Sequence, residues 1–109
     1  MHMVGLKRGL AAENPWLPAA LLKAFDRSKA DALARLTDTS ATKVTMPFVE
    51  EQLRSVRRLM GEDYWPYGLA ANRKVLDNFL DHHHRQGLSP RRLGAEELFH
   101  PSTHETHKI

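Results

Sequence analysis

Three stretches of this chain carry apolar residues at helical spacing, whereas a single short stretch has the pattern of a β-strand. Met3, Val4 and Leu6 form an apolar run that Gly9 closes, so we predict a strand over residues 1–8. A lone strand leaves its backbone N–H and C=O groups without partners. The sequence therefore predicts a mainly α chain whose one strand needs a sheet from outside these 109 residues.

The first helix is predicted over residues 14–36. Asn14-Pro15 is a start signal, because Asn caps helices and Pro fits the first turn. Apolar residues then recur at helical spacing, at Leu17, Leu21, Leu22, Phe25, Ala32, Leu33 and Leu36. The other faces are occupied largely by charged residues, which we expect to face solvent: Asp26, Lys29, Asp31 and Arg35.

Two further helices are predicted, over residues 47–60 and 69–86. Gly61 ends the first, and Gly87 followed by Leu88 is typical of a glycine C-cap at the end of the second. Short helical turns are predicted over 90–99 and a polar tail over 100–109. With the strand, these elements make one partial domain, 1–109.

An aromatic turn at 61–68 separates the last two helices. It holds Tyr64, Trp65 and Tyr67 around one proline, between two glycines. Large rings are costly to leave in water. This turn therefore either packs against the rest of the fold or forms the wall of a site.

Composition excludes several classes of function. The chain has no cysteine, which rules out disulfides and thiolate metal sites. No apolar run approaches the roughly 20 residues that a membrane span needs, and no signal peptide precedes the first helix. The net charge of +3 comes from basic and acidic residues interspersed along the helices, so we expect no nucleic-acid partner. A cytoplasmic location is expected from the family resemblance described next.

An ordered set of motifs resembles the C-terminal third of 4,5-dihydroxyphthalate decarboxylase and its close relatives. The aromatic turn is the most specific motif, and the order of the whole set is stronger than any one piece. The set consists of Met1-His2-Met3-Val4 with Lys7-Arg8, Asn14-Pro15-Trp16, Lys23-Ala24-Phe25, Met46-Pro47-Phe48, Met60 to Gly68, Asn72-Arg73, Phe79-Leu80, His82-His83, Gln86 to Ser89, and Glu96 to Phe99.

The resemblance implies a longer protein of the type II periplasmic-binding-protein architecture, with two α/β lobes around a cleft. Its implied reaction converts 4,5-dihydroxyphthalate to 3,4-dihydroxybenzoate and carbon dioxide, without a cofactor, and its implied partner is a small aromatic dicarboxylate. This stretch by itself would lack most of the cleft and is expected to be inactive.

Two alternatives stay open. The longer protein could be a solute-binding protein of a transporter, located in the periplasm, that binds a small organic acid without chemistry. The chain could instead be a small helical interaction module.

The resemblance places the strand beside the cleft, which makes His2 the candidate catalytic residue. Histidine readily exchanges a proton near neutral pH; the alternative is a hydrogen-bonded residue at a hinge. Trp65 and Tyr67 are candidate substrate-binding residues that could stack on the substrate ring. The competing interpretation, which we favour, is that they anchor the turn.

Asn72 and His83 fall on the apolar stripe of the third helix, where polar side chains need partners. Asn72 is the third candidate for substrate binding, although capping of the aromatic turn is the simpler role. Adjacent histidines on a helix point about 100° apart, so His82-His83-His84 cannot chelate one ion. His100, His104 and His107 lie in the polar tail, and we predict no metal site.

Overall fold

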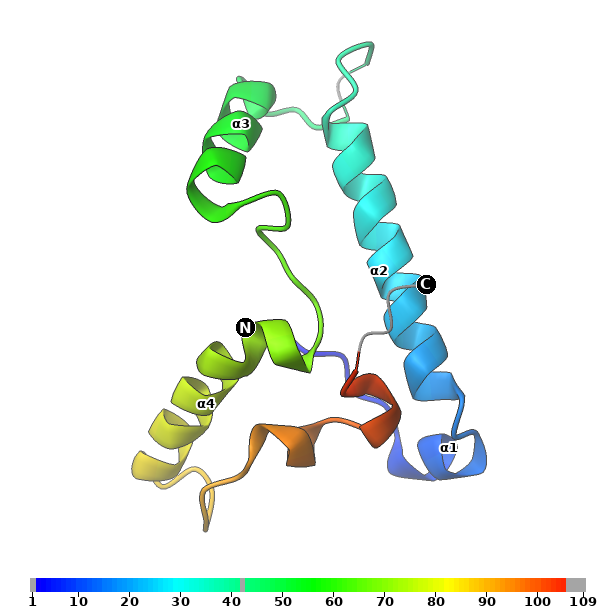
Figure 1. Cartoon of the computed structure of the whole chain (residues 1–109), viewed down its shortest axis with the longest axis vertical. Coiled ribbons are helices and arrows are strands. Elements are labelled where there is room, and N and C mark those ends of the chain that lie inside the picture. Colours follow the sequence, from blue (N-terminus) through cyan, green and yellow to red (C-terminus); the bar gives the residue numbers. More distant parts are fainter. Residues whose placement is uncertain (1, 42, 106–109) are drawn as a thin grey trace. The chain divides into compact units, whose positions relative to one another are not determined.

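The computed structural model describes residues 2–41 and 43–105, and all of its regular elements are helical (Figure 1). The chain divides into two compact units, each described by itself. One consists of Met1–Lys23 with Tyr67–Ile109, and the other of Ala24–Pro66. The mainly α prediction agrees with this structure.

The first unit begins with an irregular segment instead of a strand. Residues 2–7 have no regular structure, and helix α1 follows at Arg8–Glu13. The strand predicted over 1–8 is therefore not formed, and Met1 lies outside the described residues. The backbone groups of a strand need a neighbouring strand, and the described part of the chain provides none. Helix α1 was not predicted, although Leu10, Ala11 and Ala12 are good helix formers.

Asn14 ends α1 and does not cap the long helix that follows. Its backbone N–H donates to the Leu10 carbonyl at 3.0 Å, and its side-chain Nδ2 donates to the same oxygen at 3.3 Å. Helix α2 then covers Leu17–Leu36, three residues later than predicted. Pro18 lies in its first turn, where a missing N–H costs little, and is buried.

Helix α4, Leu69–Arg85, supplies the core of the first unit. Leu69, Leu76 and Leu80 are buried against Ala95 of the short helix η1, Ala95–Leu98. Leu93 and Phe99 pack at the edge of this cluster. A second short helix, η2, covers Pro101–Thr103, while residues 106–109 of the predicted tail lie outside the described residues.

The end of α4 is closed by a glycine motif. Leu88 N–H donates to the His83 carbonyl at 3.1 Å, and Gly87 N–H donates to the His84 carbonyl at 2.9 Å. Gly87 has φ +73°, a conformation that favours glycine. This pair of bonds is the Schellman arrangement. Leu88 itself stays 65% exposed.

Two arginine–carboxylate pairs join α4 to the segment after it, and a third pair lies within that segment. Arg73 of α4 pairs with Glu96, and Arg92 pairs with Asp81 of α4. The third pair, Arg91 and Glu97, closes the loop onto η1 through two bonds of 3.0 and 2.6 Å. Exposed ion pairs are individually weak. Together they specify how the C-terminal segment folds back on α4.

The second unit contains the later part of α2, then α3 at Val49–Met60 and most of the aromatic turn. Helix α3 was predicted to start at Pro47. It starts two residues later because Phe48 adopts a left-handed conformation with φ 58°. Leu53 is its buried residue. Glu50 and Glu51 in the first turn complement the helix dipole.

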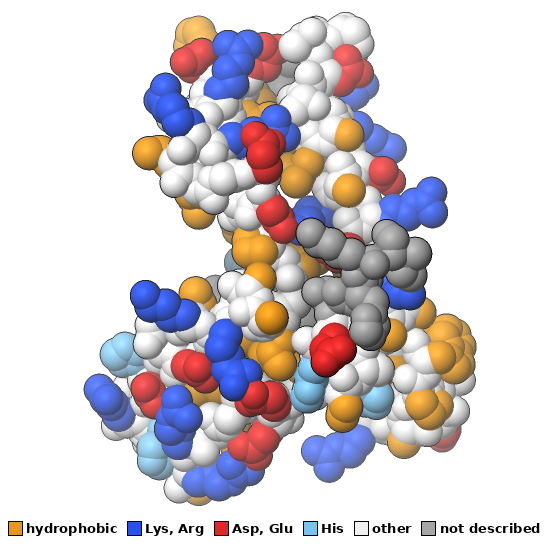
Figure 2. Space-filling view, viewed as in Figure 1, with side chains coloured by type: hydrophobic (Ala, Val, Ile, Leu, Met, Phe, Trp, Pro, Cys, Tyr) orange, Lys and Arg blue, Asp and Glu red, His pale blue; other side chains and the backbone are white. Residues whose placement is uncertain are grey.

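Many large apolar side chains on these elements remain exposed, and Figure 2 shows apolar atoms at the surface among the charged ones. Leu59 and Phe48 of the second unit are 79% and 81% exposed. On α4, the apolar residues Val75 and Phe79 are exposed, whereas Leu76 and Leu80 are buried. The helices therefore bury only part of their apolar faces within the described residues.

Candidate functional site

The aromatic turn, residues 61–68, is delimited by two glycines in a rare backbone conformation. Gly61 has φ 90° and ψ 174°, and Gly68 has φ 96° and ψ 159°. Side chains with a Cβ are almost excluded from this region. The two glycines thus end α3 and begin α4 sharply, leaving Tyr64, Trp65 and Tyr67 on a segment without helical structure.

Lys29 of α2 anchors this turn in the second unit. Its Nζ donates to Asp63 Oδ1 at 3.1 Å and to the Trp65 carbonyl at 3.3 Å. Asp26, one turn earlier on α2, lies 3.6 Å from the same ammonium group. The Lys29 side chain is only 15% exposed. Lys29 therefore does not face solvent as the helical pattern predicted.

Arg57 provides a second connection near the start of the turn. Its Nε lies 3.3 Å from Glu62 Oε2, close enough for an ion pair. The same Nε is buried and forms no hydrogen bond with the described residues. The Glu62 side chain is 85% exposed. Sequence reasoning missed this pair and the Lys29 contacts. The acidic Glu62-Asp63 step next to the rings was the one signal that could have indicated them.

The three candidate substrate-binding residues are divided between the two units. Trp65 belongs to the unit Ala24–Pro66 and is 60% exposed, whereas Tyr67 and Asn72 belong to the other unit and are half-buried. Asn72 Nδ2 donates to the Gly68 carbonyl at 2.9 Å. This hydrogen bond is the one expected of a residue that caps the turn.

His2 is exposed and lies on the irregular segment 2–7. Its catalytic role stays a prediction. The segment that carries it lacks the neighbouring strand that would fix its position.

His83 occupies the half-buried side of α4. Its ring lies 5.7 Å from that of Phe79, tilted by 42°. Its Nδ1 atom is buried and has no hydrogen-bond partner in the part of the chain that the structure describes. The sequence predicted that His83 lies on the apolar face of this helix and needs a hydrogen-bond partner. The described residues provide no such partner for Nδ1.

Two other histidines, His84 and His104, contact backbone carbonyl groups near them in the sequence. His84 Nδ1 lies 3.2 Å from the Ser89 carbonyl, and His104 Nε2 lies 3.0 Å from the Phe99 carbonyl. Within residues 2–41 and 43–105, no group of three histidine or acidic side chains is placed to hold a metal ion. His107, named above with His100 and His104, lies outside the described residues.

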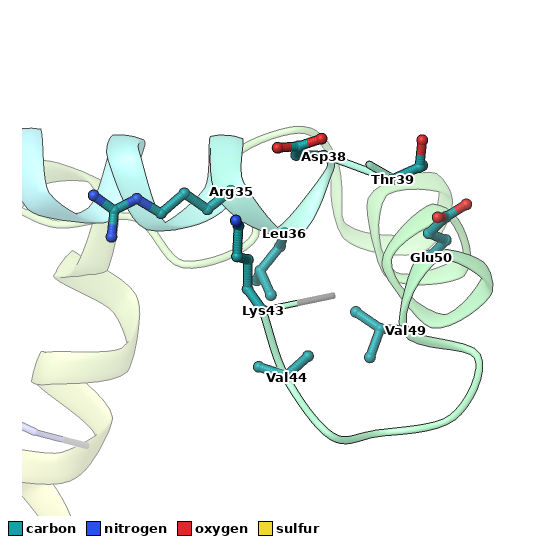
Figure 3. Close-up of a pocket in the computed structure, with 8 residues that line it drawn as sticks. All are labelled: Arg35, Leu36, Asp38, Thr39, Lys43, Val44, Val49 and Glu50. Atoms are coloured by element: carbon teal, nitrogen blue, oxygen red, sulfur yellow. The ribbon is translucent and has the colours of Figure 1, made fainter. Parts of the chain in front are cut away.

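One small hollow lies in the second unit, between the end of α2 and the start of α3 (Figure 3). Its volume is about 50 Å³, whereas ligand pockets usually measure about 300–1,000 Å³. None of the candidate site residues lines it. The lining residues are Arg35, Leu36, Asp38, Thr39, Lys43, Val44, Val49 and Glu50.

The charged groups that line this hollow do not converge on it. Arg35 extends away from the other labelled side chains (Figure 3). The Asp38 carboxylate accepts hydrogen bonds from Ser40 Oγ at 2.6 Å and Ser40 N–H at 3.0 Å. These bonds lower the pKa of Asp38. The hollow is thus a by-product of loop structure and is too small for an aromatic dicarboxylate.

The chain was compared with known proteins, and one similar protein was found. No protein-family model matches it. Over its full length, the chain is similar to 4,5-dihydroxyphthalate decarboxylase of Comamonas testosteroni. The two are 60% identical over 109 residues, which is all of this chain and 33% of that decarboxylase. The chain therefore spans about a third of the length of the curated relative that it matches. This confirms the resemblance that the ordered motifs indicated.

The matched range, residues 1–109, contains the positions of all the candidate residues. In this chain, the aromatic turn is held by Lys29 of α2 and Arg57 of α3. No helix in the described residues is both long enough and apolar enough to cross a membrane.

Proposed function

We propose that this chain is the C-terminal part of an aromatic-acid decarboxylase that converts 4,5-dihydroxyphthalate to 3,4-dihydroxybenzoate and carbon dioxide. The observation that carries the proposal is the 60% identity to a protein of that name, maintained over all 109 residues. Because the chain matches only a third of that relative, the active unit is a longer protein. The chain alone is inactive.

The exposed apolar side chains support a longer active unit. Leu59, Met60 and Phe48 in one unit, and Val75 and Phe79 in the other, are between 42% and 81% exposed. The apolar face of an amphipathic helix normally packs against another part of the protein. The rest of the decarboxylase covers these side chains.

In the longer protein, residues 2–7 pair as a strand with a sheet contributed by the remaining sequence. The complete fold is an α/β type II periplasmic-binding-protein architecture with the substrate in the cleft. The strand then carries His2 to the cleft.

The reaction defines what the cleft must supply. The bond between the ring and one carboxylate breaks, carbon dioxide leaves, and the ring carbon takes a proton. Cationic or hydrogen-bonding groups must hold the two carboxylates, and an acid must deliver the proton. His2 is the proposed proton donor, Trp65 and Tyr67 stack on the ring, and Asn72 donates a hydrogen bond to the substrate.

A chimera tests this proposal. The matching third of the Comamonas testosteroni decarboxylase is replaced by this chain, and the purified protein is incubated with 4,5-dihydroxyphthalate. We expect 3,4-dihydroxybenzoate and one equivalent of carbon dioxide. A folded chimera that binds the substrate and returns it unchanged would favour the solute-binding alternative and contradict the proposal.

A further inference from the structure

The geometry points to Lys29 as a positioning residue that fixes Trp65 for substrate binding. This inference rests on the proposed decarboxylase function and names a residue that neither the sequence motifs nor the comparison assigns to the site. It concerns only the unit Ala24–Pro66, which contains both residues.

The first observation is that a nearly buried ammonium group binds the turn at two points. Lys29 Nζ donates to Asp63 Oδ1 at 3.1 Å and to the Trp65 carbonyl at 3.3 Å, while its side chain is 15% exposed. A lysine with so little exposed surface is stabilised by partners of this kind, because an unpaired charge in a poorly hydrated position is costly. The turn and α2 are therefore held in one arrangement.

The second observation concerns Trp65 itself. Its carbonyl is held by Lys29, whereas the residue is 60% exposed. A fixed backbone with an exposed ring is what a stacking contact requires, because less conformational freedom is lost on binding. Lys29 thus acts through Trp65 and does not need to touch the substrate.

The residue type fits this role. A lysine ammonium group has three donors around a compact charge, which suits a carboxylate and a carbonyl approached from one point. Arginine carries a planar fork with a different donor geometry. Lys29→Arg should therefore restore the position of Trp65 only in part, and Lys29→Met should lose it.

The experiment uses the active chimera and measures KM and kcat separately. We expect Lys29→Met to raise KM about tenfold, because loss of orientation weakens substrate binding, with kcat changed much less. Lys29→Arg gives an intermediate KM. The matched control is Lys23→Met, an exposed lysine on the same helix, which leaves both parameters unchanged.

A double-mutant cycle distinguishes positioning of Trp65 from general stabilisation. If Lys29 acts through Trp65, adding Lys29→Met to the Trp65→Ala variant causes no further rise in KM, because the effects of coupled residues are not additive. Asp63→Asn replaces Lys29→Met in the cycle if the latter does not fold. Independent, multiplicative effects, or an unchanged KM in Lys29→Met, would overturn the inference. A chimera without any decarboxylation would instead count against the proposed function.

Discussion

Gly61 illustrates how a single residue defines the aromatic turn. Its φ of +90° favours glycine, yet a Cβ built there meets no atom within 4 Å. Replacement by alanine therefore adds backbone strain without a steric clash. Gly68, at the other end of the turn, has φ 96°.

We predict that Gly61→Ala lowers the free energy of unfolding by about 1–3 kcal/mol, the usual cost of such a conformation. The loss is measured by urea denaturation, with unfolding monitored by circular dichroism. Gly5→Ala is the control, since Gly5 lies in the irregular segment with open space around it. Equal stability of the two variants would show that the turn does not depend on Gly61.

Glu97 gives a pH-dependent prediction at the same scale. The bidentate hydrogen bonds from Arg91, together with that from the Gly94 N–H at 2.7 Å, lower the pKa of Glu97 from 4.5 to about 2. A carboxylate with a lowered folded-state pKa stabilises the fold above its unfolded pKa. That contribution is lost as the pH falls from about 4.5 through about 2.

The measurement is the stability difference between the protein and its Glu97→Gln variant over this pH range. We expect the protein to be the more stable at pH 5 and the difference to shrink towards zero near pH 2. A difference that stays constant across the range would mean that the carboxylate charge of Glu97 does not stabilise the C-terminal segment.

Sequence reasoning succeeded and failed at particular residues for physical reasons. Asn72 was expected to cap the turn from its place on the stripe, and its bond to Gly68 is local, four residues apart. Lys29 was expected to face solvent from its place on the helix. Its partner Asp63 lies 34 residues away in the sequence. Helical periodicity contains no information about such a distant contact.

At the scale of elements, α4 is the best determined part of the chain. Leu69, Leu76 and Leu80 lie on one face and bury against Ala95, and glycines mark both ends. The predicted range 69–86 nearly matches Leu69–Arg85 because both ends depend on local signals. The starts of α2 and α3 shifted by two or three residues, since neither Asn14 nor Pro47 began its helix.

The core of α4 gives the third prediction. Leu76 is 2% exposed, so Leu76→Ala should lower the free energy of unfolding by about 2–5 kcal/mol through lost burial and a cavity. Its neighbour Val75 is 56% exposed, and Val75→Ala should change the stability of this chain by itself by less than about 0.5 kcal/mol. Thermal or urea denaturation of both variants decides the matter, and similar losses would contradict the assigned core.

At the scale of the whole molecule, the described residues leave apolar helix faces uncovered and residues 2–7 without a strand partner. Both features have one explanation under the proposed function, because the chain matches only a third of its relative. Periodicity could predict the helices within the chain. It could not predict the sheet or the opposite wall of a cleft, which under the proposed function are built by residues outside this sequence.

We propose above that this chain completes a decarboxylase. The most direct test of that role compares carbon dioxide release from 4,5-dihydroxyphthalate by three proteins: the chimera, the Comamonas testosteroni decarboxylase lacking the matching third, and this chain alone. We predict release by the chimera and none by either part. Equal release by the shortened decarboxylase and the chimera, or turnover by the chain alone, would contradict it.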